Sequence, residues 1–493
     1  MMHGPEKSDS LVVPGKPANK AASAAAELGE GRSGTEGNAM MQSMVRTQSW
    51  EAVSQAQSRI REAVNRNGKE KLTALLHHID VDVLRAGFLS LKKSASAGVD
   101  QMTWGMYEAA LEENLQRLHQ RLHAGAYRAL PSRRVYIPKA DGKQRPLGIA
   151  AMEDKIVQAA TVMILTPIYE AEFLGFSYGF RPGRSQHDAL DALAYGIKGR
   201  NIWWILDADI SRFFDTINHE WLVKFMEHRI GDRRIIRLIQ KWLKAGVLEQ
   251  GARIDTSQGT PQGAVISPLL ANIYLHYVYD LWVQAWRKRH ADADMIVVRY
   301  ADDTIVGFQY VSDAHAFLGE LRDRLAKFGL SLHPEKTRLI AFGRFVAERR
   351  AAQGLSKPET FDFLGFTHIC GKKRGGKGFQ LWRKTKRKRK TETVKRIATE
   401  LRHMRSSPID EQGRWLAQVL RGHYAYFAVP TNLQAVRAVR HLVKIRWYLS
   451  LLRRSQRRRL TWRRMNVIVE KYLPMPRVLH PWLEQRFLVK HRR

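Results

Sequence analysis

The 493-residue sequence contains a single cysteine, Cys370. One thiol cannot form a disulfide within the chain, and it cannot build the paired-cysteine centres that hold structural zinc. Long apolar runs are also missing, because no stretch is long enough to cross a bilayer as a helix. The sequence therefore argues against a disulfide-stabilised scaffold, a cysteine-based zinc protein and a membrane-spanning protein, and it suits a reducing compartment.

Acidic residues are scarce in the last quarter of the chain. Residues 371–493 contain 34 Lys and Arg but only six Asp and Glu, so this quarter carries 28 of the whole-chain net charge of +35. Such an excess predicts a polyanionic partner. The chain's 13 Trp and 15 Tyr lie scattered among the basic residues, which favours nucleic acid over a lipid surface.

Aromatic residues are few in the first 50 residues, which are rich in Ala, Gly and Ser. This composition predicts a disordered leader over residues 1–50, with order beginning near Trp50. The leader has neither the apolar core of a secretion signal nor the acid-poor composition of a transit peptide. A folded unit is expected at residues 51–370. A glycine-rich, flexible basic connector then leads into a basic α-helical domain at residues 371–493.

The stretch MIVVRYADDTIVGF, residues 295–308, places two acidic residues between two apolar runs. Runs rich in Val and Ile on either side of a tight acidic turn predict a β-hairpin. At its tip Asp302 and Asp303 would share divalent cations, because Mg²⁺ prefers carboxylate oxygens and leaves room for substrate phosphates. The alternative at this point is that the two aspartates form an ordinary polar turn.

A second acidic stretch, NIWWILDADISRFFDTI, spans residues 201–217. Ile202 to Leu206 predicts a buried strand, with Asp209 at or just beyond its end, where its carboxylate can face Asp302 across a shared metal. Asp207 shares the face of Asp209 if the strand continues. Asp215 is more typical of a turn or a helix entry.

Three further stretches contain candidate substrate-binding residues. RRVYIPKADGKQRPLGI, residues 133–149, predicts a basic hairpin in which Lys143 and Arg145 either hold a triphosphate or line a solvated surface. FSYGFRPGRS, residues 176–185, includes Arg181 and combines aromatic rings with positive charge, as in contacts to bases and phosphates. QGTPQG, residues 258–263, is a fixed loop whose Gln262 offers an amide to a sugar or base edge. Each stretch alone is also consistent with an ordinary loop.

Taken in order, the stretches resemble a group II intron-encoded reverse transcriptase and maturase. The matching pieces are RPLGI, FSYGFRPGRSQHDA, DADISRFFDTI, QGTPQGAVISPLLANIYL, RYADDTIVGF, GLSLHPEKT and FDFLGF. RGHYAYFAVPTN, residues 421–432, is similar to the maturase region of that family. Seven short pieces in the family's order are far more specific than any one of them.

The resemblance implies an α+β right-hand polymerase. Fingers and a palm with an antiparallel sheet would occupy residues 51–370, and an α-helical thumb and maturase domain residues 371–493. The implied activity is RNA-directed DNA synthesis with two Mg²⁺ ions. The implied partners are group II intron RNA, an RNA template with a DNA primer, dNTPs and target DNA, in a bacterial, cytoplasmic ribonucleoprotein without membrane contact.

The resemblance also implies roles for individual residues. Asp209 and Asp302 would bind both metals with Asp303 beside them, and Lys336 would protonate the leaving pyrophosphate. The implied nucleotide contacts are an aromatic gate at Phe214, a nucleotide or template contact at Gln262, and triphosphate contacts at Lys143 and Arg145. The alternatives are core packing for Phe214 and a solvent-facing strand end for Lys336.

Two other functions remain open from the sequence. One is an RNA-binding maturase without polymerase activity, which the intact Asp209, Asp302 and Asp303 disfavour. The other is a reverse transcriptase domesticated for phage defence, CRISPR-associated acquisition or diversity generation, which the maturase-like residues 421–432 disfavour. Because no cysteine pairs follow the basic helices, we expect the compact family type without a C-terminal endonuclease.

Overall fold

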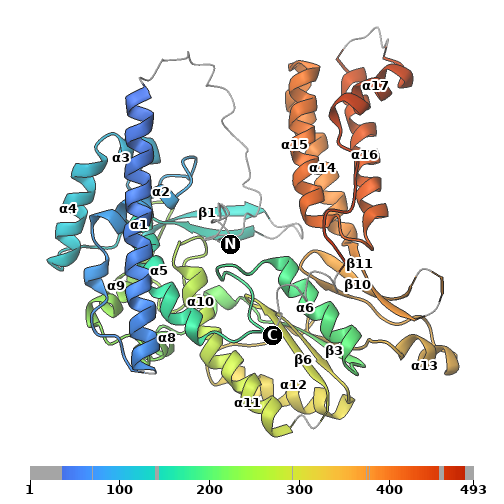
Figure 1. Cartoon of the computed structure of the whole chain (residues 1–493), viewed down its shortest axis with the longest axis horizontal. Helices are drawn as coiled ribbons and strands as arrows, with labels where there is room; N and C mark the ends of the chain where they lie inside the picture. Colours follow the sequence, from blue (N-terminus) through green and yellow to red (C-terminus); the bar gives the residue numbers. More distant parts are fainter. Residues whose placement is uncertain are drawn as a thin grey trace, which may run out of the picture.

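A computed structural model describes the ranges 36–68, 70–138, 144–290, 293–373, 375–376, 378–454 and 460–482. Helices and β-sheets are mixed along these residues, which confirms the α+β class (Figure 1). Three sheets lie between a layer of N-terminal helices and a bundle of C-terminal helices. No helix in the described part of the chain has the length and apolar character needed to cross a membrane.

The N-terminal layer is built on the long helix α1 (Glu36–Asn67), which packs against α2 (Val81–Ser90) and α5 (Met152–Glu172). The helix begins well before Trp50, so the expected start of order was wrong. Residues 39–48 are rich in Met and Gln, which have good helix propensity, although they lack the aromatic residues typical of a core. Smaller elements complete the layer: η1 (Leu76–His78), α3 (Trp104–Glu108) and α4 (Leu111–His123).

The first sheet, which we call the N-terminal sheet, has the strand order β2-β1-β4-β5. β1 (Ser132–Pro138) and β2 (Gln144–Ile149) are antiparallel, as predicted for the basic hairpin, and Ile137 pairs with Arg145. β4 (Val247–Glu249) runs parallel to β1 and pairs with β5 (Ala252–Ile254). Two helices precede β4 in the chain, α8 (His219–Glu227) and α9 (Arg233–Lys244).

The central sheet has the order β6-β7-β3-β8, with every neighbouring pair antiparallel. Its strands are β6 (Met295–Tyr300), β7 (Asp303–Phe308), β3 (Trp204–Asp209) and β8 (Arg338–Ala341). The predicted hairpin of residues 295–308 is therefore confirmed as β6–β7. The expected strand before Asp209 is confirmed as β3, which runs through Asp209 itself.

Both faces of the central sheet are buried. Successive side chains of a strand point to opposite faces, and each face packs against a core of its own. Val297 and Leu206 join a large core that reaches back to α1, whereas Val298 and Ile205 join a second core shared with α6 (Gln186–Gly199). The large core also takes side chains from α10 (Ser267–Leu275), the π-helical turn η2 (His276–Asp280), α11 (Leu281–His290) and α12 (Val311–Ala326). The N-terminal layer and one face of the central sheet thus share a continuous core.

The third sheet, the hairpin sheet, has the order β11-β10-β9 and follows α13 (Val346–Ala352). β9 (Phe361–Phe363) pairs with β10 (Phe366–Lys372), and β10 pairs along its whole length with β11 (Phe379–Thr385). The expected flexible connector after residue 370 was therefore wrong, since residues 371–372 and 379–385 form ladder hydrogen bonds. Its glycines lie at the hairpin turn, where Gly375, Gly376 and Gly378 all have positive φ.

The C-terminal bundle has its own core, formed by residues such as Leu401, Leu420, Val443 and Trp447. Its helices are α14 (Arg387–His403), α15 (Ile409–Phe427), α16 (Leu433–Leu452) and α17 (Trp462–Tyr472), with η3 (Met404–Ser406) between the first two. In Figure 1 the bundle stands above β10 and β11, away from α1.

Candidate active site at the β6–β7 turn

The central sheet brings the predicted carboxylates to one edge. Asp209, the last residue of β3, lies opposite Asp303, the first residue of β7, in the antiparallel register. Asp302 precedes Asp303 in the turn that joins β6 to β7. Asp209 retains 21% of its side-chain exposure, so its carboxylate is accessible to solvent. Two strands distant in sequence therefore present three carboxylates at the same end of the sheet.

The turn itself has a strained backbone. Ala301 has a φ of +56°, a left-handed conformation that costs a residue with a Cβ about 1–2 kcal/mol. The loop of residues 176–180 packs against this turn so closely that a Cβ added to Gly179 would lie 2.3 Å from the backbone nitrogen of Ala301. Only glycine allows that approach, which explains its position in the FSYGF stretch.

Lys336 reaches the same site from the loop before β8. Its Nζ lies 2.6 Å from Oδ2 of Asp209 although the lysine side chain is 62% exposed. The loop is tied to the end of β3, because the His333 amide donates to the Asp209 carbonyl at 2.7 Å and the Ser211 amide to the Ser331 carbonyl at 2.8 Å. The structure therefore brings the predicted lysine to the predicted aspartate.

Asp207 lies two residues before Asp209 on β3, in register with Arg338 of β8. Burial, together with the nearby negative charge of Asp209, raises the pKa of Asp207 to about 7. A buried carboxyl near neutral pKa is a weaker metal ligand than an ionised carboxylate. Asp207 and Asp209 share one face of β3, and Asp209, opposite Asp303, is the one that lies at the edge beside the turn.

Oxygen donors from Asp209, Asp302 and Asp303 fit Mg²⁺ chemically, since hard divalent cations select carboxylates. Among the residues that the structure describes, no three His, Cys, Asp or Glu side chains are gathered closely enough to form a complete metal cage.

A hydrogen-bonded chain joins three of the other predicted stretches. Arg145 Nε of β2 donates to Gln262 Oε1 at 2.8 Å, and Gln262 Nε2 donates to Asp215 Oδ1 at 3.1 Å. Asp215 belongs to the short helix α7 (Phe213–Thr216), and the Thr260 amide donates to the Phe214 carbonyl of the same helix at 2.8 Å. The structure thus brings Arg145, Gln262 and Phe214 together. Lys143 lies outside the described residues.

Phe213 and Phe214 have different surroundings although they are adjacent. Phe213 is buried and packs against Tyr274, whereas Phe214 is half-buried at the edge of the core. The partly open ring of Phe214 is therefore the one available to a bound molecule.

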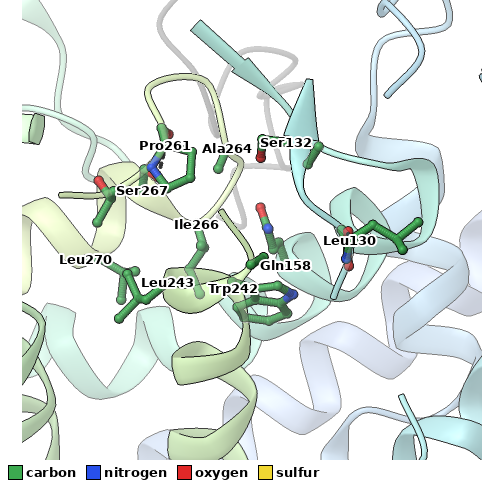
Figure 2. A pocket seen from close by; sticks show the side chains of 14 residues that line it. Leu130, Ser132, Gln158, Trp242, Leu243, Pro261, Ala264, Ile266, Ser267 and Leu270 are labelled. Atoms are coloured by element: carbon green, nitrogen blue, oxygen red, sulfur yellow. Dashed lines mark hydrogen bonds between the residues drawn. The ribbon is translucent and has the colours of Figure 1, made fainter. Parts of the chain in front are cut away.

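A narrow cavity lies beneath the loop that carries Gln262 (Figure 2). Gln158 of α5 points into this region, and its Oε1 accepts the Val265 amide at 3.0 Å. At the cavity wall Tyr127 donates to Asp154, whose pKa burial raises to about 6. The cavity is lined largely by apolar side chains, so it supports the loop from behind and offers little to a charged substrate.

Arg181 does not line the site, which argues against its predicted substrate contact. Its side chain is only 3% exposed, and its Nε and Nη2 donate to the carboxylate of Glu170. Nη1 donates to the carbonyls of Leu174 and Ser177. The guanidinium is thus used to fix its own loop, a role that aromatic and basic composition alone does not distinguish from nucleic-acid contact.

Sequence reasoning also missed a buried group directly beneath the acidic turn. Arg299 of β6 is 1% exposed and contacts Asp280 and Asn272. The available sequence signal was a lone charge in the apolar run MIVVRY, facing lone polar residues in the apolar helix after residue 266. Buried charges require partners, so such isolated residues predict one another.

Comparison with known proteins agrees with this geometry. Residues 137–368, slightly less than half of the chain, match the family of reverse transcriptases (RNA-dependent DNA polymerases). Protein YkfC of Escherichia coli (strain K12) is 45% identical over 194 residues, which cover 38% of this chain and 50% of that protein. The group II intron-encoded protein LtrA of Lactococcus lactis subsp. cremoris is 37% identical over 223 residues, covering 44% of this chain and 37% of LtrA.

A more distant relative is the mitochondrial nuclear intron maturase 1 of Arabidopsis thaliana, 28% identical over 111 residues, which cover 22% of this chain and 15% of that protein. The chain spans about half the length, or less, of the curated relatives it matches. The resemblance to group II intron reverse transcriptases and maturases is confirmed.

Proposed function

Because the chain contains a reverse transcriptase domain related to those of group II intron-encoded proteins, we propose that it is an RNA-directed DNA polymerase. The observation that carries the proposal is the pairing of Asp209 with Asp303 at the edge of the central sheet, next to Asp302. Template-directed nucleotide addition requires no protein nucleophile, since the attacking group is the 3′-hydroxyl of the primer.

The three sheets and the bundle correspond to the parts of a right-hand polymerase. We assign the central sheet and its helices to the palm, the N-terminal layer and N-terminal sheet to the fingers, and the C-terminal bundle to the thumb. The continuous core between the N-terminal layer and the central sheet supports fingers and palm as one unit. The separate core of the bundle supports a thumb that is attached through the hairpin sheet.

Asp209, Asp302 and Asp303 would hold two Mg²⁺ ions. When bound, such ions activate the primer hydroxyl and stabilise the negative charge of the departing pyrophosphate. Lys336 forms an ion pair with Asp209. Because the lysine side chain is largely exposed, its ammonium can turn toward the leaving phosphate and donate a proton there. Lys336 thereby combines charge neutralisation at the carboxylate with general acid catalysis.

The incoming dNTP would lie between the N-terminal sheet and the central sheet. Arg145 and Lys143 belong to the basic hairpin and would bind its triphosphate, because guanidinium donors match phosphate oxygens. Gln262 is held by Arg145 and Asp215, and its remaining amide N–H would contact the nucleotide or template. Phe214, the half-buried ring of α7, would contact the sugar and exclude a ribose 2′-hydroxyl.

The basic bundle is suited to RNA. Helix α16 contains four Lys and Arg and no acidic residue. Positive charge of this density binds phosphate backbones without reading base sequence. We propose that the bundle holds the duplex of RNA template and DNA primer, binds intron RNA as a splicing maturase and contacts target DNA during insertion.

Primer extension tests the polymerase directly. The full-length protein is incubated with a 5′-labelled DNA primer on an RNA template, with dNTPs and Mg²⁺, and products are separated by size. We expect extension to the template end, loss of extension in EDTA, and recovery when Mg²⁺ is restored. Tight RNA binding without any extension would replace the polymerase proposal by the non-polymerising maturase.

A further inference from the structure

Arg299 is the penultimate residue of β6, two residues before Ala301 of the acidic turn. It is among the largest fully buried side chains of the described residues, with 1% exposure, in a strand that is otherwise apolar. A buried guanidinium is tolerated only when its charge is paired and its donors are satisfied, because desolvation costs several kcal/mol. Its partners therefore show what the residue does.

All five N–H donors of Arg299 have acceptors. Nε donates to Asp280 Oδ1 at 2.7 Å, and Nη2 donates to Asp280 Oδ2 at 2.5 Å and to Ser177 Oγ at 2.7 Å. Nη1 donates to Asn272 Oδ1 at 3.1 Å and to the Ala301 carbonyl at 3.0 Å. A lysine ammonium has only three donors and no planar fork, so it cannot reproduce this set.

The bond to Ala301 acts on the turn itself. Ala301 holds the left-handed φ of +56°, and its carbonyl belongs to the peptide unit that leads into Asp302. Strained backbone persists only where surrounding contacts fix it. The guanidinium supplies one such contact from below, while the close approach of Gly179 supplies another from the side.

The same group ties the neighbouring loop to the turn. Ser177, which accepts from Arg299, forms a parallel bridge with that residue's backbone, and the Tyr178 amide donates to the Arg299 carbonyl at 2.8 Å. Asn272, the other side-chain acceptor, donates to the Gly179 carbonyl at 2.7 Å. One guanidinium thus connects strand β6, helix α10 and the loop that touches Ala301.

The ionic partner comes from an irregular helix. Asp280 ends the π-helical turn η2, and π-turns inside helices occur frequently at functional sites. Asp280 is 0% exposed, and its carboxylate receives two donors from Arg299. His276, one turn earlier, has its Nδ1 4.0 Å from Asp280, and burial lowers the pKa of His276 to about 4. Arg299 is therefore the counter-ion of Asp280 at neutral pH.

We propose that Arg299 is a positioning residue for the polymerase site: through the Ala301 carbonyl, Ser177 and Asn272 it fixes the turn that presents Asp302 and Asp303. The proposal rests on the proposed function for its catalytic consequence, but the ordering of the turn is a structural effect that is measured independently. Arg299 acts on the turn through the Ala301 carbonyl and through the side chains of Ser177, Asn272 and Asp280.

Three variants separate positioning from stability. Arg299→Lys keeps the positive charge but loses the planar fork. Arg299→Met combined with Asp280→Leu removes both charges at similar volume, a change that is often neutral for folding when a buried pair is replaced as a unit. Arg322→Lys makes the same replacement at an exposed arginine of α12 and serves as the control.

The measurements are thermal unfolding, primer–template affinity, single-turnover extension at saturating dNTP, and amide hydrogen exchange across Ala301–Thr304. We expect the double variant and Arg299→Lys to bind primer–template within about twofold of wild type, with extension roughly 100-fold slower, a typical loss when reacting groups are misplaced by about 1 Å. Exchange at the turn should accelerate in both variants. Arg322→Lys should match wild type in extension and in exchange at the turn.

The outcomes are distinguishable. Wild-type extension rate and wild-type exchange in Arg299→Lys would overturn the proposal. So would a folded double variant that recovers both extension and turn protection, because Arg299 would then only support the core. If the double variant does not fold, the extension rate and the exchange of Arg299→Lys alone test the proposal. If the wild-type protein extends no primer, the proposed function fails, whereas the exchange measurement still tests the positioning of the turn.

Discussion

Arginine is used in opposite ways in the two halves of the molecule. In the N-terminal layer and around the central sheet, Arg181, Arg229 and Arg299 have side chains no more than 4% exposed, and each is paired with a carboxylate. In the C-terminal bundle the basic residues lie largely on the surface, as in Arg387–Arg389, which are all exposed. The ion pair between Lys471 and Asp410 is solvent-exposed on both sides.

The difference shows that net charge alone does not locate the nucleic-acid surface. A buried, paired arginine adds nothing to the field outside the protein, whereas an exposed and unneutralised cation contributes one counterion-releasing contact when it meets a phosphate. The buried arginines of the first half therefore fix backbone and paired carboxylates, whereas those of the bundle are exposed where they can meet phosphates. Four predictions test this comparison.

The largest effect is expected at the carboxylates of the central sheet. Asp209→Asn and Asp302→Asn each remove a charged metal ligand, so primer extension should fall by roughly 1,000-fold or more, with RNA affinity little changed. Single-turnover extension and filter binding measure the two properties. The matched control is Asp323→Asn, an exposed acid of α12. Robust extension by either site variant would remove that residue from the proposed metal site.

The second effect concerns the joint where the two halves meet. Arg383 of β11 pairs with Asp191 of α6 at 2.9 Å, and both side chains are buried. Arg383→Met leaves Asp191 charged without this partner, so the free energy of unfolding should fall by about 3 kcal/mol. Adding Asp191→Leu should restore most of it, as followed by urea unfolding. Equal stability of Arg383→Met and wild type would show that the joint does not depend on this pair.

The third prediction compares the same exposed charges at two places in the molecule. The tripeptide Arg-Lys-Arg occurs at residues 387–389 on α14 of the bundle and again, also exposed, at residues 287–289 on α11 below the central sheet (Figure 1). Replacing residues 387–389 by Gln should lower RNA affinity at 0.1 M salt by roughly 100-fold and flatten the log–log salt slope by about 2–3.

The same replacement at residues 287–289 removes an identical charge and should leave both values nearly unchanged. Salt titrations of RNA binding measure both triple variants side by side. Equal losses would mean that overall charge, and not the placement of the bundle, determines affinity.

The smallest effect is expected at Phe214. Phe214→Ala removes a half-buried ring, and the preference for dNTP over rNTP should fall by roughly tenfold, the order expected when one steric contact is lost from a pocket. Single-nucleotide incorporation gives both rates. Phe345→Ala, an exposed ring elsewhere, is the control. An unchanged preference would assign the gate to another residue, with Phe213 disfavoured because it is buried.

Much of the active site was predicted from local sequence patterns. Apolar runs rich in Val and Ile on both sides of Ala301, Asp302 and Asp303 predicted the β6–β7 hairpin, and the run from Ile202 predicted a strand that places Asp209 at its end. These predictions succeeded because hairpins and buried strands depend on periodicity and turn residues that are contiguous in sequence. The connector after residue 370 failed because glycine marks a hairpin turn as well as a flexible linker.

The sequence by itself determined that the protein is a mixed α+β chain with a basic C-terminal helical region and a paired-aspartate hairpin, since composition, charge and periodicity are local properties. Only the tertiary structure decided which charges face solvent. The sequence alone does not distinguish Arg181 and Arg299 from the arginines of the bundle. Arg299 is buried by contacts with residues distant in the chain, such as Asn272 and Asp280. Burial and pairing depend on long-range contacts, and a single sequence does not specify those contacts residue by residue.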